Sequence, residues 1–212
     1  MTPEEIEKNK AAYLEQCRRH ISREGLEALL KYLEEKTDFF RAPSSTAFHL
    51  NEEGGLCKHS LNVFEAAAAM YEHVLRQRMQ EGTATFSGEI PMESIAITTL
   101  FHDLCKTDLY HPSERFKKDE SGRWVTYAGY EIKDNFPFGH GEKSCFILER
   151  FMRLKPSELL AIRWHMGMFD MGEQGSVQRY AFRAALERTP LVCLVHAADF
   201  IASNCLETTI VH

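Results

Sequence analysis

The sequence has no pair of cysteines at CxxC spacing, although it contains six cysteines. Thiolate zinc sites and thiol redox motifs use such pairs, whereas scattered cysteines are typical of reduced thiols. It also has no apolar run long enough to span a bilayer, since the longest, Leu191 to Ala202, is interrupted by His196 and Asp199. The opening MTPEEIEKNK is charged from its fourth residue and does not resemble a secretory signal. These absences predict a cytoplasmic protein without a membrane partner.

A surplus of basic residues is also missing. The chain has 25 Lys and Arg against 31 Asp and Glu, a formal net charge of -6. Because a basic footprint supplies most of the attraction in nucleic-acid binding, nucleic acid is disfavoured as a partner. A small anionic ligand remains compatible with this balance, since a metal ion and a few local cations override the overall sign.

No internal repeat or low-complexity linker divides the chain, and 212 residues with 44% hydrophobic side chains suit one domain with a substantial core. Periodic apolar residues and the positions of Pro and Gly predict an all-α domain spanning 1–212. The expected helices cover residues 4–20, 24–36, 56–79, a segment after Pro91, 140–153, 156–166, 176–188 and 190–206. Gly167 suits a helix C-cap and Pro190 a helix start, and Arg41 to Gly55 reads as a loop.

The segment 105–137 differs from the rest of the chain. It is rich in Gly, Pro, Lys and Asp and lacks helical periodicity. Residues 124–127 and 130–132, separated by Ala128-Gly129, predict a short β-hairpin. An irregular connection of this length inside a compact domain is more often functional than incidental.

Asp199 carries the first chemical signal. It lies in the stretch Leu191 to Ala202, which is apolar on nearly every side and therefore predicts a buried helix. A buried carboxylate costs on the order of several kcal/mol unless it is paired or binds a metal. A salt bridge to an arginine and a helix cap are the ordinary alternatives.

Two further apolar helices carry similar signals. The run from Ile95 to Phe101 leads into His102 and Asp103, and these neighbours can address one metal only near a helix end. We therefore expect the helix to lose its register just after Cys105. His59 lies near the start of another apolar helix. Chance burial explains one such residue well but three such helices poorly, so together they predict a metal site.

The order His59, His102-Asp103, Asp199 resembles the HD superfamily of metal-dependent phosphohydrolases, which is named for its His-Asp pair. The likeness covers roughly residues 45–205 and is carried by Gly54-Gly-Leu-Cys-Lys-His59-Ser-Leu-Asn-Val63, Leu100-Phe-His-Asp-Leu-Cys-Lys106 and Val195-His-Ala-Ala-Asp199. The glycine pair and His49 are similar to the HD module of bacterial 3′–5′ exoribonucleases. The resemblance implies an HD-domain helical bundle, with residues 1–44 as N-terminal helices ahead of an HD core.

The resemblance also implies a ligand set. His59, His102, Asp103 and Asp199 would bind a first divalent ion, and Asp103 would bridge to a second ion held by His140 and His165. Imidazole and carboxylate ligands suit Fe, Mn, Ni, Co or Zn and do not choose among them. Alternatively, His140 and His165 line the pocket as acid, base or phosphate donors.

The expected activity is hydrolysis of a phosphoester, such as a nucleotide or related small phosphorylated molecule, by metal-activated water. Asp103 and Lys106 are the predicted catalytic residues, and Lys106 and His49 the predicted substrate contacts. Lys106 lies three residues after Asp103, which is one turn on along the same helix face. Its alternative is an exposed lysine beyond a helix end.

Two other functions stay open at this stage. The same six ligands also resemble the di-iron oxygenases of the HD superfamily, of the inositol oxygenase kind. A non-catalytic nucleotide-binding HD module is the third possibility, although such a module has no reason to keep buried His and Asp together. The amphipathic N-terminal helices either pack on the domain or form a homodimer.

Overall fold

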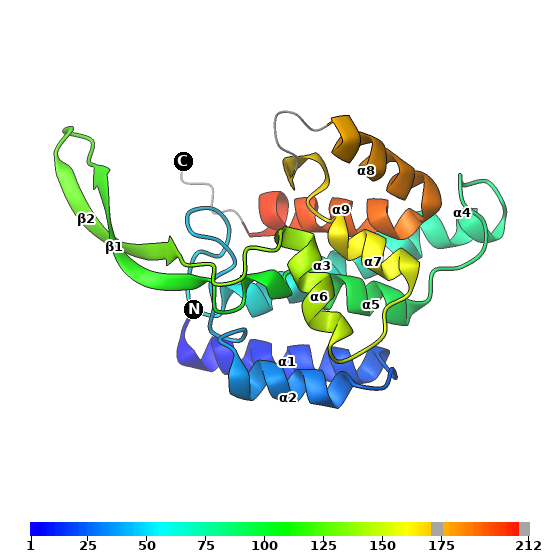
Figure 1. The fold of residues 1–212 in the computed structure, drawn as a ribbon, viewed down its shortest axis with the longest axis horizontal. Coiled ribbons are helices and arrows are strands. Elements are labelled where there is room, and N and C mark those ends of the chain that lie inside the picture. Colours follow the sequence, from blue (N-terminus) through cyan, green and yellow to red (C-terminus); the bar gives the residue numbers. More distant parts are fainter. Residues whose placement is uncertain (171–175, 208–212) are drawn as a thin grey trace.

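The computed structural model describes residues 1–170 and 176–207 and has a predominantly helical fold with one small antiparallel sheet, as predicted (Figure 1). The longer elements are α1 (Pro3–His20), α2 (Leu26–Lys36), α3 (Gly55–Met70), α5 (Met92–Leu100), β1 (Tyr110–Lys118), β2 (Trp124–Ile132), α6 (His140–Glu149), α7 (Pro156–Arg163), α8 (Ser176–Arg188) and α9 (Pro190–Ile201). Short elements complete the chain: η1 (Tyr71–Leu75), α4 (Arg76–Gln80), η2 (Leu104–Lys106), η3 (Gly167–Asp170) and η4 (Ala202–Leu206).

Helix starts follow the local signals in the sequence. Thr2 caps α1 in a capping box with Glu5, in which each side chain bonds the backbone N–H of the other residue. Pro190 occupies the first turn of α9, and the Thr189 side chain accepts a hydrogen bond from the Leu191 N–H. These caps explain why the predicted N-terminal ends of these helices agree closely with the structure.

The core lies around α3 and α9, which pack against each other. α5 packs on α3, and α7 packs on α9. α1 packs against α3 and α5 and forms an outer layer with α2 (Figure 1). Tyr13 of α1 is fully buried, and its hydroxyl donates to the Leu100 carbonyl at 2.9 Å. The N-terminal helices therefore pack on the domain, while the expected homodimer stays a prediction.

The sequence predicted a hairpin, but it placed the turn of that hairpin at the wrong residues. Residues 124–127 and 130–132 belong to the single strand β2, which pairs with β1 from Tyr110↔Ile132 to Lys118↔Trp124. The turn lies at 119–123, where Asp119 accepts hydrogen bonds from the Ser121 and Arg123 N–H groups. Gly122 has a φ of 78°, whereas Gly129 does not have the left-handed conformation that a tight turn requires. The local Asx turn therefore decides the position of the hairpin.

Three predicted helix ends are also shifted. α5 ends at Leu100 rather than after Cys105, because Phe101 and Asp103 leave helical geometry with ψ angles of 8° and 22°. α6 ends at Glu149 rather than 153, and α7 at Arg163 rather than 166. Gly167 has a positive φ of 57°, and its N–H donates to the Trp164 carbonyl at 2.8 Å, but it begins η3 and is not the predicted C-cap of α7, which is Trp164.

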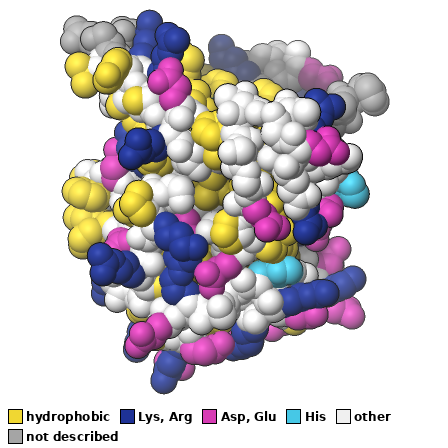
Figure 2. All heavy atoms as spheres, turned by 90° about the vertical axis from the view of Figure 1, so that its right-hand side faces the viewer, with side chains coloured by type: hydrophobic (Ala, Val, Ile, Leu, Met, Phe, Trp, Pro, Cys, Tyr) yellow, Lys and Arg dark blue, Asp and Glu magenta, His cyan; other side chains and the backbone are white. Residues whose placement is uncertain are grey.

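Charge is mixed over the surface that faces away from the hairpin. On the described part of this face, Lys and Arg side chains are interspersed with Asp and Glu (Figure 2). In the part of the chain that the structure describes, no single helix has the length and composition to cross a bilayer, and only Val177–Arg188 taken with Pro190–Leu206 passes, with a 109° bend between them.

Candidate metal centre

His59 projects from the start of α3 and is 1% exposed. Two glycines make this position possible, because Gly54 has a φ of 82° and a Cβ on Gly55 would lie 2.1 Å from the Leu50 carbonyl oxygen. The loop that precedes α3 therefore packs closely on the helix start, and it brings His49 within 4.8 Å of His59 between ring centroids.

His102 and Asp103 lie in the turn just beyond α5, and both are buried. Since they are no longer held at the helical angle of about 100°, both side chains point into one cluster. His102 Nδ1 lies 2.7 Å from the Thr99 carbonyl, which only accepts hydrogen bonds. Nδ1 of His102 therefore carries the proton, and its Nε2 presents a lone pair to the cluster.

His165 repeats this arrangement at the end of α7. Its Nδ1 donates to the Ile162 carbonyl at 2.7 Å, again three residues earlier in the chain. Among the described residues its Nε2 is buried and has no hydrogen-bond partner. Asp199, on α9, has a side chain 12% exposed, and its Oδ1 lies 3.2 Å from His59 Nε2. Its partner is thus an imidazole rather than the arginine that the alternative interpretation requires.

His140 comes from the first residue of α6. Its Nε2 lies 3.0 Å from Asp103 Oδ1, and its Nδ1 lies 3.3 Å from the Cys105 sulfur. The structure thus brings together the six predicted ligands, which we call the candidate metal centre: His59, His102, Asp103, His140, His165 and Asp199.

Asp103 lies at the middle of the centre and faces two pairs of histidines. Its Oδ2 is 3.2 Å from His102 Nε2 and 3.6 Å from His59 Nε2. Its Oδ1 is 3.0 Å from His140 Nε2 and 3.4 Å from His165 Nε2. A carboxylate that addresses separate ligand pairs with its two oxygens has the arrangement of a bridging ligand.

The outer hydrogen bonds show which ring nitrogens face the centre. His59 Nδ1 lies 3.0 Å and 3.1 Å from the two carboxylate oxygens of Glu207, so this nitrogen is also the donor. The Nε2 atoms of His59 and His102 lie 3.2 Å apart, and in the metal-free protein the raised pKa of His59 keeps a proton on its Nε2 at neutral pH. A divalent ion would take the place of that proton. The residues therefore fit a divalent transition ion with nitrogen and oxygen ligands.

The pKa values of the ligands are shifted because charged groups lie close together in the centre. Burial alone lowers the pKa of His59, but Asp199 and Glu207 outweigh it and raise the pKa to about 9. Burial raises the pKa of Asp103, yet Lys106 and His102 hold it well below its usual value. The pKa of Asp199 is also lowered, because its bond to His59 overcomes the cost of burial.

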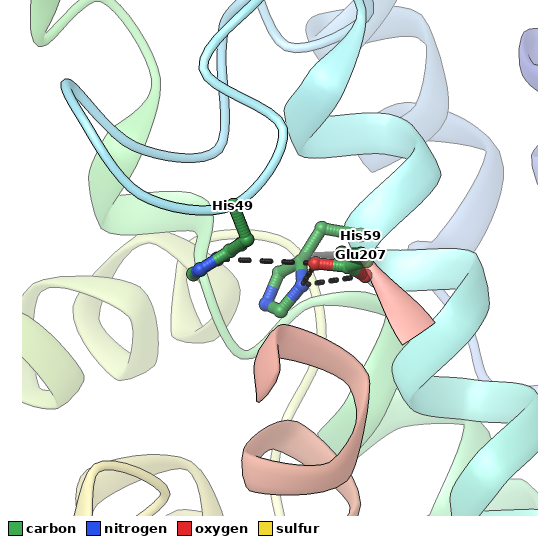
Figure 3. A group of neighbouring side chains, drawn as sticks. All are labelled: His49, His59 and Glu207. Carbon is green, nitrogen blue, oxygen red and sulfur yellow. Dashed lines mark hydrogen bonds and ion pairs between the residues drawn. The ribbon is translucent and has the colours of Figure 1, made fainter. Parts of the chain in front are cut away.

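Glu207 is the residue that sequence reasoning missed. It follows η4 and is 148 positions away from His59, and its side chain is only 1% exposed (Figure 3). It also accepts a hydrogen bond from Asn62 at 2.8 Å. Burial raises and these contacts lower its pKa, with a net lowering, so it remains a carboxylate. A polar Asn62 one turn beyond His59 in an apolar helix was the available signal for such a partner.

The two predicted substrate contacts lie beside the centre. His49 lines the adjoining cavity, 4.0 Å from Glu207, and burial with the nearby His59 and Lys106 lowers its pKa to about 4 (Figure 3). Lys106 is 8% exposed, and its Nζ lies 2.6 Å from Asp103 Oδ2, so it is not an exposed lysine. That either residue binds substrate stays a prediction.

A cavity of about 910 Å³ opens on the candidate metal centre. His140 and Asp199 form part of its wall, whereas His165 lies behind them with no exposed surface. Pockets of roughly 300–1,000 Å³ are typical of sites for small molecules. The centre is therefore accessible to a small ligand from one side.

Comparisons of the chain with protein-family models, with curated proteins and with solved structures find no match.

Proposed function

We propose that this protein is a metal-dependent phosphohydrolase with a two-ion centre. The observation that carries the proposal is the environment of Asp103, whose two oxygens each face a different pair of imidazole nitrogens. Three of these histidines hold their Nδ1 protons on oxygen acceptors, which orients Nε2 inward. Such outer partners are the usual companions of metal-binding histidines.

The first ion would bind His59, His102, Asp103 and Asp199, and the second Asp103, His140 and His165. A bound divalent ion would supply Lewis acidity, activating water for attack on phosphorus and stabilising charge on the phosphoryl oxygens. The side chains that hold it are supported from outside the centre by Thr99, Ile162 and Glu207.

Lys106 supplies the permanent positive charge beside the centre. Burial lowers its pKa, but Asp103 outweighs this and keeps the pKa above its usual value. In the proposed reaction its ammonium group contacts a non-bridging phosphoryl oxygen and neutralises charge as the substrate binds. The contact is electrostatic, since an ammonium is a compact point charge with three donors.

The choice of phosphoester chemistry also draws on the HD resemblance. Its four signature residues, His59, His102, Asp103 and Asp199, come from three separate helices and meet within one buried cluster. This meeting supports assignment to the HD superfamily and an HD-type bundle.

A di-iron oxygenase is the second candidate. The observation that favours it is the ligand set itself, four imidazoles and two carboxylates, which suits iron as well as other transition metals. Oxygen consumption by the iron-loaded protein with a polyol or phosphonate would support this candidate, and a hydrolase would show none.

Metal analysis of protein prepared without chelators and without a His-tag tests the proposal directly. We expect about two transition-metal ions per chain and hydrolysis of bis-p-nitrophenyl phosphate. His140→Ala is expected to lower the content to about one ion, because His140 lies within ligand distance of the second-position residues Asp103 and His165 only. His73→Ala, which changes an exposed histidine in η1, serves as the control. Absence of metal after reconstitution with iron, manganese, nickel, cobalt or zinc would overturn the proposal.

A further inference from the structure

The β1–β2 hairpin has one apolar face that is largely exposed. The hairpin projects from the helical body, and the extensive contacts of each strand are with the other strand (Figure 1). Because directly opposite residues of an antiparallel pair share a face, the register places Phe116, Trp124 and Ile132 on the same side. Their side chains are 65%, 68% and 62% exposed. A two-stranded sheet by itself is marginally stable in water, so this exposed face indicates a partner.

Backbone hydrogen bonds at the two ends of the hairpin show which residues face its outer edges. The Asp119 N–H donates to the Arg123 carbonyl at 2.9 Å, and the Lys133 N–H donates to the Leu109 carbonyl at 3.0 Å. The register between these two pairs is unbroken, so odd-numbered residues of β2 bond to β1. The even-numbered residues of β2 therefore direct their backbone N–H and C=O groups outward. They are Trp124, Thr126, Ala128, Tyr130 and Ile132.

The two outer edges of the hairpin differ in their protection against pairing with another strand. On β1 the outward residues include Pro112, which has no N–H, and the charged Glu114 and Lys118. Proline and charged side chains are the usual devices that prevent an edge strand from pairing. β2 contains no proline, and Glu131 is its one charged residue. The outer edge of β2 is therefore the edge that suits a further strand.

We propose that β2 pairs with β2 of a second copy of this chain, so that two hairpins form one four-stranded antiparallel sheet. A two-fold axis, the commonest symmetry of homo-oligomers, relates the two copies. Outward residues of one copy bond to outward residues of the other, which places both apolar faces on the same side of the new sheet. Trp124 of each copy then lies opposite Tyr130 of the other, an aromatic pair that removes apolar surface from water.

Opposite charges at the two ends of β2 select the register of this pairing. With Tyr127 at the two-fold axis, Arg123 of each copy lies opposite Glu131 of the other. Within one chain Arg123 contacts Asp119 at 3.4 Å and Glu131 contacts Lys133 at 2.6 Å, but the Arg123 and Glu131 side chains are still 81% and 41% exposed. The edge is therefore complementary to itself, since one chain supplies both members of the pair.

Moving the axis by one residue removes this complementarity. With the axis at Ala128, Arg123 would face Lys133 of the other copy, and like charges directly opposite each other destabilise a sheet. With the axis at Thr126, both Arg123 and Glu131 would face uncharged residues. The register centred on Tyr127 is thus favoured over its two neighbours by charge.

The oligomeric state of the full chain tests the interface directly. We expect analytical ultracentrifugation to show a concentration-dependent dimer. Ala128→Pro removes an outward N–H from β2 without removing a hydrogen bond to β1, so this variant should be monomeric. Glu114→Pro is the matched control, because Glu114 lies directly opposite Ala128 and directs its N–H to the other edge. This control should remain dimeric.

Charge reversal tests the register. Arg123→Glu and Glu131→Arg should each weaken dimerisation about tenfold, because like charges then face each other at both ends of the paired strands. An equimolar mixture of the two variants should form heterodimers, since every Glu then faces an Arg, and the double variant should dimerise like the wild type. Arg115→Glu changes an exposed arginine on β1 and should leave the dimerisation constant unchanged.

Three results would overturn the proposal. A wild-type chain that stays monomeric at every concentration, or a dimer that Ala128→Pro leaves intact, would exclude this interface. A dimer that Arg123→Glu strengthens would exclude this register, since the new carboxylate would then face Lys133 of the other copy. If Ala128→Pro does not fold, the charge reversals still decide. None of these measurements depends on metal binding or hydrolysis, so the interface and the proposed function stand or fall separately.

Discussion

Glu158 and Asp103 are both buried carboxylates at the middle of polar clusters, but their surroundings differ. Glu158 receives Arg23 at 2.6 Å and 3.0 Å, the Ser94 hydroxyl at 2.7 Å and the Lys155 N–H at 2.8 Å. Its two oxygens are thus matched by donors of the chain itself. Asp103 instead lies among the Nε2 atoms of four imidazoles, with the Lys106 ammonium 2.6 Å from its Oδ2.

This difference separates a structural ion pair from a binding site. In the Glu158 cluster, the loop after α1 is joined to α7 by a bidentate pair that is complete when the chain folds. In the candidate metal centre, folding brings four imidazoles and a second carboxylate around Asp103, a set of side chains able to bind a metal ion. We therefore expect substitutions at Glu158 to change stability and those at Asp103 to change metal binding and activity.

Asp103→Asn gives the largest expected effect. It replaces one bridging oxygen with an amide NH₂ that does not bind a metal, so metal content should fall and phosphodiester hydrolysis should drop to background. The readouts are metal per chain and hydrolysis of bis-p-nitrophenyl phosphate, with circular dichroism to verify folding. A folded variant with wild-type activity would contradict the bridging role.

Glu158→Ala should show the opposite behaviour. It removes the bidentate partner of Arg23, which keeps only Glu93 at 3.1 Å, and is expected to lower the free energy of unfolding by about 3 kcal/mol. Urea denaturation measures this loss, and metal per chain in the folded fraction should be unchanged. Exposed Glu65→Gln on α3 serves as the control for an acidic side chain without such a role.

A pH series compares the two clusters in metal-free protein. Folding raises the pKa of His59 from 6.5 to about 9. Its contribution to the free energy of unfolding is therefore fully present below pH 6.5 and is lost as the pH rises to about 9. The expected loss is on the order of 1–3 kcal/mol. Because the pKa of Glu158 is lowered from 4.5, its contribution is lost at the other end, as the pH falls below that value.

The His59→Gln variant identifies the source of the alkaline loss. In this variant the free energy of unfolding should no longer fall between pH 6.5 and 9, whereas its fall at acid pH should be unchanged. Urea denaturation midpoints at each pH measure both. An unaltered alkaline limb in this variant would assign the effect to another group.

Of the four substitutions considered, at Asp103, Glu158, His59 and Glu207, Glu207→Gln should have the smallest effect. Gln still accepts a hydrogen bond from His59 Nδ1 but lacks the charge, so metal affinity is expected to fall by about 10–100-fold while the fold is kept. Glu207→Ala should lose more, since the ring is no longer oriented. Competition with a chromogenic chelator measures both, and affinities equal to wild type would make Glu207 a packing residue only.

Much of the candidate metal centre was predictable because its signals are local. Asp199 and His59 are polar residues in apolar helices, and His102-Asp103 follows an apolar run. Burial of such residues is costly unless they are partnered, so their presence alone indicates a site. Pro190 likewise marked a helix start through its own backbone preference.

Other features depended on contacts between distant parts of the chain. The hairpin turn was misplaced because an Asp119 side chain, rather than a glycine, organises it. α5 ended earlier than expected, since the backbone leaves helical geometry at Phe101 and Asp103. The pairing of Glu207 with His59 joins residues 148 positions apart, and no local pattern encodes it.

The sequence by itself determined which elements form and which polar groups must be buried, since helical periodicity, caps and the cost of desolvation act within short stretches. Only the tertiary structure decided how those groups meet: which oxygen of Asp103 faces which histidines, which carboxylate orients His59, and which side chains line the cavity beside them. These relations depend on the packing of α3, α5, α7 and α9, because the position of each side chain is set by the whole core rather than by its neighbours in the chain.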